Sequence, residues 1–391
     1  MQLSNRITGL TGGGSDGWDL FLHAREMIAN GTPVIELTIG EHDIRTAPLI
    51  LDEMHRAARA GHTGYASVPG IPALRDAIAT RLTERTGVPT TRDNILITPG
   101  GQAGLFAAHN ATTDPGDTAL YIDPYYTTYP GTIRGVGALP RAVLARPEHG
   151  FQPQAADIAA AANGATSLLI NSPNNPTGVV YTETTLTGIA KTCRDHGMWL
   201  ISDEVYDTQV WNGQHISPRA LPDMADHTLV VGSMSKGHAM TGSRVGWIAG
   251  PPDAIEHLIN LATHTTYGVA GFVQDAALFA LGLGPEFEAE IAAPFARRRQ
   301  IAERILARSN VVRHVPCDGA MYIMLDIRAT GMSGEAFGYA LLEAEHIAVM
   351  PGESFGSAAA GHLRVAMTVD DAAFEDALHR LIKFAEANTR A

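Results

Sequence analysis

Trp199-Leu200-Ile201-Ser202-Asp203-Glu204 is a short apolar run that ends in two carboxylates. Similar runs, most of them followed by a polar or glycine-rich turn, recur before about residue 250, and helical patterns follow several of them. This alternation is typical of βαβ units and predicts an α/β fold with a mostly parallel central sheet. The expected strands are Asn94–Thr98, Thr118–Ile122, Ser167–Asn171, Trp199–Ser202, Leu229–Gly232 and Val245–Ala249, and the expected helices are Gly101–Asn110, Thr182–Asp195 and Gly271–Ala280.

The two ends of the chain have a different pattern. A charged helix is expected over Phe287–Arg308, strands near Met321–Asp326 and Leu363–Met367, and a last helix from Ala372 to Asn388. We therefore predict an N-terminal arm with part of a small domain over 1–45, a large domain over 46–283 and a smaller α+β domain over 284–391. The arm holds the glycines at 12–14, which we interpret as a loop, and an amphipathic segment over 16–30.

Composition excludes several classes of function. The 391 residues are 45% hydrophobic and 18% charged, which is enough apolar content for a large core. A net charge of −13 disfavours binding to nucleic acid or to an anionic membrane surface. Two cysteines form neither a disulfide framework nor a zinc motif, and no apolar run is long enough to span a membrane or to act as a signal peptide. We expect a cytoplasmic protein without a metal.

Lysine is rare in this chain. It occurs at Lys191, Lys236 and Lys383, so arginine supplies nearly all of the positive charge. Arginine cannot replace lysine where a free amine must form a Schiff base. Lys236 lies in Gly232-Ser233-Met234-Ser235-Lys236-Gly237, directly after a predicted buried strand, and is therefore a candidate for that role.

Other polar groups follow the neighbouring strands. Asp203 ends an apolar strand, where an unpaired carboxylate is expensive, so it is expected to face a cation or a protonated heterocycle. Gly100-Gly101-Gln102 opens a helix whose amides are suited to a phosphate. Strand ends of an open α/β sheet share one edge, so these groups predict a single composite site. With Tyr206, Asn175 and Arg244 as further donors, the set fits pyridoxal phosphate.

Three motifs, in this order and spacing, resemble the fold-type-I pyridoxal-phosphate transferases, in particular the class I/II aminotransferases. They are Asn175-Pro176-Thr177-Gly178, Asp203-Glu204-Val205-Tyr206 and Ser233-Met234-Ser235-Lys236, with Arg244 downstream. The resemblance extends from Leu37-Thr38-Ile39-Gly40-Glu41 to Leu363-Arg364-Val365. It implies a large domain with a central sheet flanked by helices, plus a smaller α+β domain.

The resemblance also implies roles for single residues. Lys236 corresponds to the Schiff-base lysine that also moves the substrate α-proton, and Asp203 to the partner of the pyridine nitrogen. Arg364 corresponds to the arginine that binds the substrate α-carboxylate, with Gly40 and Asn175 at the same pocket. The remaining residues correspond to groups that contact the cofactor: Tyr206 and Asn175 at the ring oxygen, Tyr126 on the ring face, and Gly101, Gln102, Ser233, Ser235 and Arg244 at the phosphate.

Tyr65 corresponds to a tyrosine that reaches the phosphate of the neighbouring subunit, which implies a homodimer with shared active sites. Two segments depart from the family. His42 stands where relatives often have proline, beside the substrate entrance. The segment 267–272 lacks a frequent Ser/Thr pair, so a contact to the partner's phosphate is expected to be either absent or supplied by Tyr267. The stretches 201–222 and 235–242 are most similar to arginine–pyruvate transaminases.

The expected reaction moves an amino group from an α-amino acid to a 2-oxo acid, with pyruvate as one candidate acceptor, in a ping-pong cycle. A carbon–sulfur β-lyase on the same scaffold is an alternative, separated by its release of ammonia and pyruvate without an acceptor. A regulatory domain that binds the cofactor is a second alternative, disfavoured by the acidic charge and the short segment before the body. A dinucleotide oxidoreductase is disfavoured because the glycine fingerprint is missing.

Overall fold

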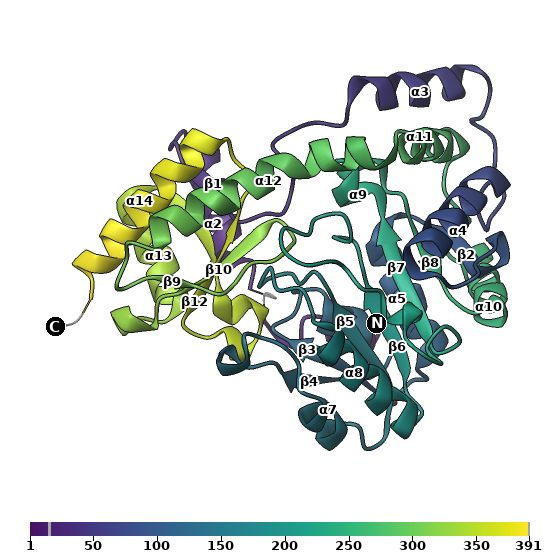
Figure 1. Cartoon of the computed structure of the whole chain (residues 1–391), viewed down its shortest axis with the longest axis horizontal. Coiled ribbons are helices and arrows are strands. Elements are labelled where there is room, and N and C mark those ends of the chain that lie inside the picture. The colour runs from purple at the N-terminus through teal and green to yellow at the C-terminus, as the bar shows by residue number, and fades with distance from the viewer. Residues whose placement is uncertain (15–16, 390–391) are drawn as a thin grey trace.

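The computed structural model describes residues 1–14 and 17–389. Its larger sheet has seven strands in the order β2-β8-β7-β6-β5-β3-β4 (Figure 1). Strands β3 to β7 pair in parallel, and β8 is antiparallel to both of its neighbours. The bounds are β2 Ile95–Thr98, β3 Thr118–Asp123, β4 Leu139–Leu144, β5 Ala165–Asn171, β6 Trp199–Asp203, β7 Thr228–Ser233 and β8 Gly246–Ala249.

The six expected strands are all found, with ends that differ by two residues or fewer. The edge strand β4 was not expected, because it contains Pro140 and Arg141 and has mostly exposed positions instead of an apolar run. Proline is tolerated at a sheet edge, where its missing amide costs no ladder bond. The prediction of an α/β fold with a mostly parallel sheet is confirmed.

Both faces of this sheet are covered by helices. Along β7, Leu229 and Val231 pack into one core with α5 and α10, whereas Val230 between them packs into a second core with α4 and α11. Burial on both faces explains why these strands are apolar throughout. The helices of this part are α3 Pro48–Arg59, α4 Pro72–Thr86, α5 Gly100–Thr112, α6 Tyr129–Gly135, α7 Ala155–Ala161, α8 Glu183–His196, α9 Met234–Gly237, α10 Pro252–Thr263 and α11 Gly271–Gly282.

A second sheet has five strands in the order β1-β11-β12-β10-β9, and it joins the two ends of the chain. β1 (Ile35–Leu37) pairs in parallel with β11 (Ile347–Pro351). The other strands are β9 Arg313–His314, β10 Tyr322–Asp326 and β12 His362–Ala366, and the helices are α1 Asn5–Thr8, α2 Asp19–Ala29, α12 Gly284–Leu306, α13 Gly334–Glu345 and α14 Asp371–Ala387. The domain boundaries at 45 and 283 stay predictions, and the start of the expected segment 16–30 lies outside the described residues.

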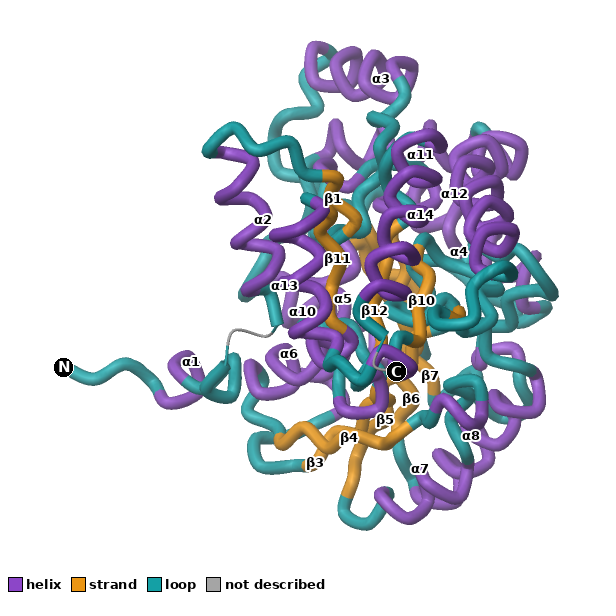
Figure 2. Tube along the Cα trace, turned by 90° about the vertical axis from the view of Figure 1, so that its left-hand side faces the viewer, coloured by secondary structure: helices purple, strands orange, loops and turns teal. Residues whose placement is uncertain are grey.

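The two sheets lie one above the other in Figure 2, with α2 and α13 beside β1 and β11. The helix α12 links them, because it packs on α14 of the small sheet and also contacts α9, which follows β7. Among the described residues, no helix has the length and apolar character needed to span a membrane. This arrangement brings β12 and the segment after β1 over the carboxyl ends of β5, β6 and β7.

Candidate active site

A cavity of about 390 Å³ lies between the two sheets, at the carboxyl ends of the large-sheet strands. All but one of the predicted site residues line it. They are Gly40, Gly101, Gln102, Tyr126, Asn175, Asp203, Tyr206, Ser233, Ser235, Lys236, Arg244 and Arg364. The structure therefore brings these twelve residues together at one edge of the sheet, while the role of each residue stays a prediction.

Lys236 reaches the cavity from the short helix α9, directly after β7. Ser233 caps this helix, because its Oγ accepts a hydrogen bond of 3.1 Å from the Ser235 amide. The Lys236 Nζ donates to the carbonyl oxygen of Gly40, and no carboxylate pairs with it within the described ranges. Burial lowers the pKa of Lys236 to about 8, although the carboxylate of Glu41 opposes the shift. A lysine with this pKa is partly neutral near pH 8 and is suited to act as a nucleophile or base.

Asp203 is the last residue of β6 and is 5% exposed. Its Oδ2 accepts a hydrogen bond of 2.7 Å from the Tyr129 hydroxyl, and its Oδ1 accepts one of 3.3 Å from the Val205 amide. We expected a cation or a protonated heterocycle opposite this carboxylate, and no described side chain forms an ion pair with it. Burial raises the pKa of Asp203 to about 6, and the bond from Tyr129 lowers it in part. A cationic group in the cavity would stabilise the ionised form.

Arg364 of β12 is 2% exposed and lines the cavity from the small sheet. Its Nη1 donates to Asn175 Oδ1 at 2.9 Å, and its Nη2 donates to the carbonyl oxygen of Thr38. The guanidinium carbon lies 4.5 Å from the ring centre of Tyr322 and 4.4 Å from that of Phe355. Burial lowers the pKa of Arg364, and its Nε has no hydrogen-bond partner. A buried guanidinium held by neutral groups is suited to a carboxylate ligand.

The first turn of α5 and Arg244 form the third part of the site. Gly100 has φ +79°, and a Cβ at this position would lie 2.4 Å from Arg244 Nη2, so the arginine packs directly on the start of the helix. The side chain of Gln102 is bound to Thr128 and Thr132 at 3.0 and 2.8 Å. The free amides of a first helical turn and a guanidinium together suit a phosphate.

Tyr65 is the predicted site residue that this cavity does not include. Its side chain is 92% exposed, and its ring packs edge-on against Tyr267 at 5.3 Å. A role for Tyr65 in the cavity of the same chain is therefore not supported. Its exposure leaves the predicted role at a neighbouring subunit open to test.

Sequence analysis missed two tyrosines at the centre of the site. Tyr129 binds Asp203, and Tyr322 lies 3.0 Å from the Tyr206 hydroxyl. The contact of Tyr322 joins residues 116 apart in the chain, so no local pattern marks it. Tyr129 follows Tyr126 by three residues in the segment after β3, which was a usable signal.

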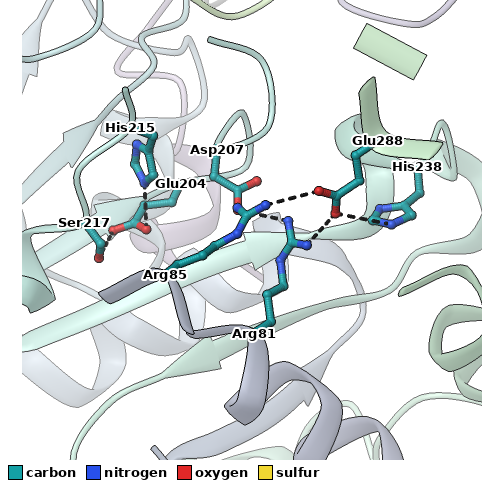
Figure 3. Close-up of polar contacts among 8 residues, drawn as sticks. All are labelled: Arg81, Arg85, Glu204, Asp207, His215, Ser217, His238 and Glu288. Carbon is teal, nitrogen blue, oxygen red and sulfur yellow. Dashed lines mark hydrogen bonds and ion pairs between the residues drawn. The ribbon is translucent and has the colours of Figure 1, made fainter. Parts of the chain in front are cut away.

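Residues close in sequence to Tyr206 and Lys236 take part in a cluster of ion pairs that does not line the cavity (Figure 3). Arg81 and Arg85 of α4 each contact both Asp207 and Glu288, with Arg81 to Glu288 at 2.5 Å and Arg85 to Glu288 at 3.1 Å. His238 lies 3.6 Å from Glu288, and burial lowers the pKa of His238 to about 3, so the ring is neutral. This cluster ties α4, the loop after β6, α9 and α12 together.

A smaller group lies beside this cluster in Figure 3. Glu204 accepts from Ser217 Oγ at 2.7 Å and contacts His215 Nε2 at 3.0 Å. Burial lowers the pKa of His215, but the carboxylates of Glu204 and Asp207 together outweigh burial, so the pKa is raised. The residue after Asp203 is thereby fixed on the side away from the cavity.

Comparison with known proteins gives the same assignment over almost the full length. Residues 32–381 match the family described as aminotransferase class I and II. An arginine–pyruvate transaminase of Pseudomonas aeruginosa is 38% identical over 383 residues, which is 97% of each chain. An aspartate/prephenate aminotransferase of Thermus thermophilus is 34% identical over 92% of this chain and 93% of its own.

Among solved structures, the aspartate aminotransferase of Thermus thermophilus with maleate superposes with a TM-score of 0.92, at 31% identity, over 98% of this chain and 100% of that one. The fold, the conjunction of groups in the cavity and these matches agree. The chain therefore belongs to the class I and II aminotransferase family.

Proposed function

We propose that this aminotransferase uses pyridoxal phosphate to move an amino group from an α-amino acid to a 2-oxo acid, with Lys236 as the residue that holds the cofactor. The observation that supports this proposal most strongly is that Lys236 and Asp203 line the same cavity. One is an amine with a pKa of about 8, and the other is a buried carboxylate with a pKa of about 6 that forms no ion pair with any described side chain.

The residues fit the cofactor at each of its ends. Asp203 would meet the ring nitrogen, and the opposite charge there would replace the missing counter-ion. Gly101, Gln102, Ser233, Ser235 and Arg244 would hold the phosphate, Tyr126 would lie against the ring, and Tyr206 and Asn175 would donate to the ring oxygen. When bound, pyridoxal phosphate acts as an electron sink for the negative charge that develops on the substrate α-carbon.

The side chains of the protein supply binding, orientation and proton transfer. Arg364 binds the α-carboxylate and, with Asn175 and the backbone at Gly40, orients the Cα–H bond. Lys236 Nζ takes the proton from the α-carbon, because its lowered pKa keeps a fraction of the amine neutral. In a first half-reaction the amino acid leaves as a 2-oxo acid, and in the second another 2-oxo acid takes the amino group.

The proposed substrates are a basic amino donor and pyruvate. The name of the Pseudomonas aeruginosa relative supports both. Glu41 lines the cavity and accepts from Thr241 Oγ1 at 3.2 Å, so one carboxylate besides Asp203 is available for a cationic side chain. We place the reaction in the cytoplasm, as the buried free thiols of Cys193 and Cys317 are typical of a reducing compartment. The proposed active unit is a homodimer in which Tyr65 reaches the partner's phosphate site.

Product analysis tests this function. The purified protein, loaded with pyridoxal phosphate, is incubated with arginine, lysine, aspartate or alanine, with and without pyruvate. A transaminase forms alanine from pyruvate and a 2-oxo acid from the donor, and its initial rates give parallel lines in double-reciprocal plots. Release of a thiol, ammonia and pyruvate from an added S-alkylcysteine, without an acceptor, would instead establish a β-lyase. Conversion of aspartate but not of arginine would overturn the basic donor.

A further inference from the structure

Tyr322 contacts three residues that line the cavity and come from different parts of the chain. It is the first residue of β10 and is 2% exposed. Its hydroxyl lies 3.0 Å from the Tyr206 hydroxyl and 3.4 Å from Asn175 Nδ2, and its ring centre is 4.5 Å from the guanidinium carbon of Arg364. One side chain of the small sheet thus contacts a phenol, an amide and a guanidinium that belong to the site.

Arg364 sets the direction of the hydrogen bond between Asn175 and Tyr322. A guanidinium only donates, so the bond of 2.9 Å from its Nη1 fixes the oxygen of Asn175 toward Arg364. The Asn175 amide nitrogen then points to Tyr322, and the Tyr322 hydroxyl accepts from it. Either hydroxyl can be the donor in the remaining bond, and we assign the donor role to Tyr322, whose oxygen already accepts from Asn175.

Because Tyr206 accepts the hydroxyl proton of Tyr322 in this assignment, its own hydroxyl hydrogen is free to point into the cavity. Donation to a phenol oxygen also makes that phenol a stronger donor, since chains of hydrogen bonds polarise one another. Tyr322 therefore influences both the direction and the strength of the Tyr206 hydrogen bond.

The position of the Tyr322 hydroxyl is enforced by its surroundings. A Cβ on Gly40 would lie 1.7 Å from this oxygen, so the space for the hydroxyl exists because residue 40 has no side chain. The rings of Tyr322 and Phe355, which belong to different segments, both contact the Arg364 guanidinium. The Phe355 ring centre lies 4.4 Å from the guanidinium carbon. The tyrosine is thus held from both its hydroxyl end and its ring face.

We propose that Tyr322 is a positioning residue of the reaction, with two separable parts: its hydroxyl turns the Tyr206 proton into the cavity, and its ring supports the Arg364 guanidinium. The inference rests on the proposed function, in which Tyr206 donates to the cofactor ring oxygen and Arg364 binds the α-carboxylate. It predicts that the two parts respond differently to Tyr322→Phe and Tyr322→Leu.

The hydroxyl part is read from a pH titration of visible absorption in the protein loaded with pyridoxal phosphate. Donation from Tyr206 draws negative charge onto the ring oxygen and makes the nitrogen linked to Lys236 less basic. Tyr322→Phe weakens this donation, so the titration midpoint rises by about half a unit to one unit, as expected for loss of one neutral hydrogen bond. Tyr322→Leu raises the midpoint by a similar amount.

The ring part is read from the binding of propionate, a carboxylate that cannot be transaminated, through its effect on the same absorption. Phenylalanine keeps the stacked ring, so the Kd of Tyr322→Phe stays within about twofold of the wild type. Leucine removes the ring, and Tyr322→Leu binds propionate about five- to tenfold more weakly.

Tyr181→Phe is the matched control, because Tyr181 is a buried tyrosine of a different core and does not line the cavity. It leaves the midpoint and the propionate Kd unchanged. A wild type without a cofactor band overturns the proposed function itself. A wild-type band whose midpoint is unchanged in Tyr322→Phe overturns the role of the hydroxyl, and equal propionate binding in Tyr322→Leu overturns the role of the ring. Phenylalanine fills the same space, so the first variant decides the hydroxyl role by itself.

Discussion

The cavity and the ion-pair cluster use residues of the same loops, and they differ in whether their charged side chains have ion-pair partners. Asp203 and Lys236 line the cavity, and neither has an ion-pair partner among the described residues. Their neighbours Glu204 and His238 face the other way, and Glu204 is held by two polar side chains. In the cluster, each of the two arginines contacts two carboxylates.

This difference indicates that the two regions have different roles. Buried charges without counter-charges cost free energy, and the cost falls when a ligand brings the opposite charge. The cavity is therefore built for ligands that carry a cationic ring nitrogen, a phosphate and a carboxylate. The cluster satisfies its charges internally, and it fixes the backbone that presents the cavity residues. Changes in the cavity are expected to alter chemistry, and changes in the cluster to alter stability.

The largest effect is expected in the cavity. Lys236→Ala removes both the anchor and the base, and turnover falls by about 10⁴-fold or more, measured as alanine formed from pyruvate. Lys191→Ala is the matched control, because Lys191 is exposed on α8 and pairs with Asp195 one turn away. Its turnover stays within about twofold of the wild type. Comparable losses in both variants would contradict the assignment of Lys236.

Glu288→Gln breaks the cluster and is expected to act on stability. Removing one partner of a buried ion pair leaves Arg81 and Arg85 with too little negative charge, and the free energy of unfolding falls by about 3 kcal/mol. Turnover per folded molecule changes by less than about threefold. Glu375→Gln, which removes an exposed partner of Arg304, costs less than about 1 kcal/mol. Urea unfolding followed by circular dichroism measures the free energy of unfolding of both variants. A large loss of turnover in Glu288→Gln with unchanged stability would contradict the structural role of the cluster.

Asp203→Asn tests the cost of an unpaired charge in the cavity. Burial raises the Asp203 pKa to about 6 from 3.8, so in the cofactor-free protein its ionised form opposes folding. The protonated Asp203 side chain makes its full contribution to the free energy of unfolding below about pH 4. This contribution is lost as the pH rises through 6. The asparagine variant is therefore more stable than the wild type above pH 6, by up to about 3 kcal/mol, and the gap closes toward pH 4. Equal free energies of unfolding for the wild type and Asp203→Asn at every pH would show that the ionised carboxylate does not destabilise the cofactor-free protein.

Tyr65 gives the smallest effect and lies in neither region. Its hydroxyl is proposed to reach the phosphate in the partner subunit, so Tyr65→Phe homodimers retain pyridoxal phosphate about tenfold more weakly. Hybrids of Tyr65→Phe and Lys236→Ala subunits contain one site with the Lys236 of the first chain and the Tyr65 of the second. That site binds the cofactor with wild-type affinity if the tyrosine crosses the interface. Affinity as weak as in the Tyr65→Phe homodimer would place the tyrosine in its own subunit's site.

Sequence reasoning worked where burial leaves a simple pattern. The strand β6 is apolar on both faces, so its run and its terminal Asp203 were visible without any tertiary information. The small sheet was harder, because β9 has two residues and β1 has three, too few to show a period. The reversed direction of β8 was not predicted, since burial on both faces looks the same in either orientation.

The site divides in the same way. Residues at or just after the ends of strands, such as Asp203 and Lys236, were predicted from their place in the chain. Tyr322 was missed because its importance arises from contacts with Tyr206, Asn175 and Gly40, which lie far away in sequence. The ion-pair cluster was missed for the same reason, as its charges come from α4, α12 and two loops.

The most direct test of the account is the absorption spectrum of the purified protein with pyridoxal phosphate, before and after addition of single amino acids. We predict a visible band that is absent in Lys236→Ala, and its loss in the wild type when the correct amino donor converts the cofactor to its amine form. A wild type that shows no band after incubation with pyridoxal phosphate would contradict the assignment of Lys236 and of the whole cavity.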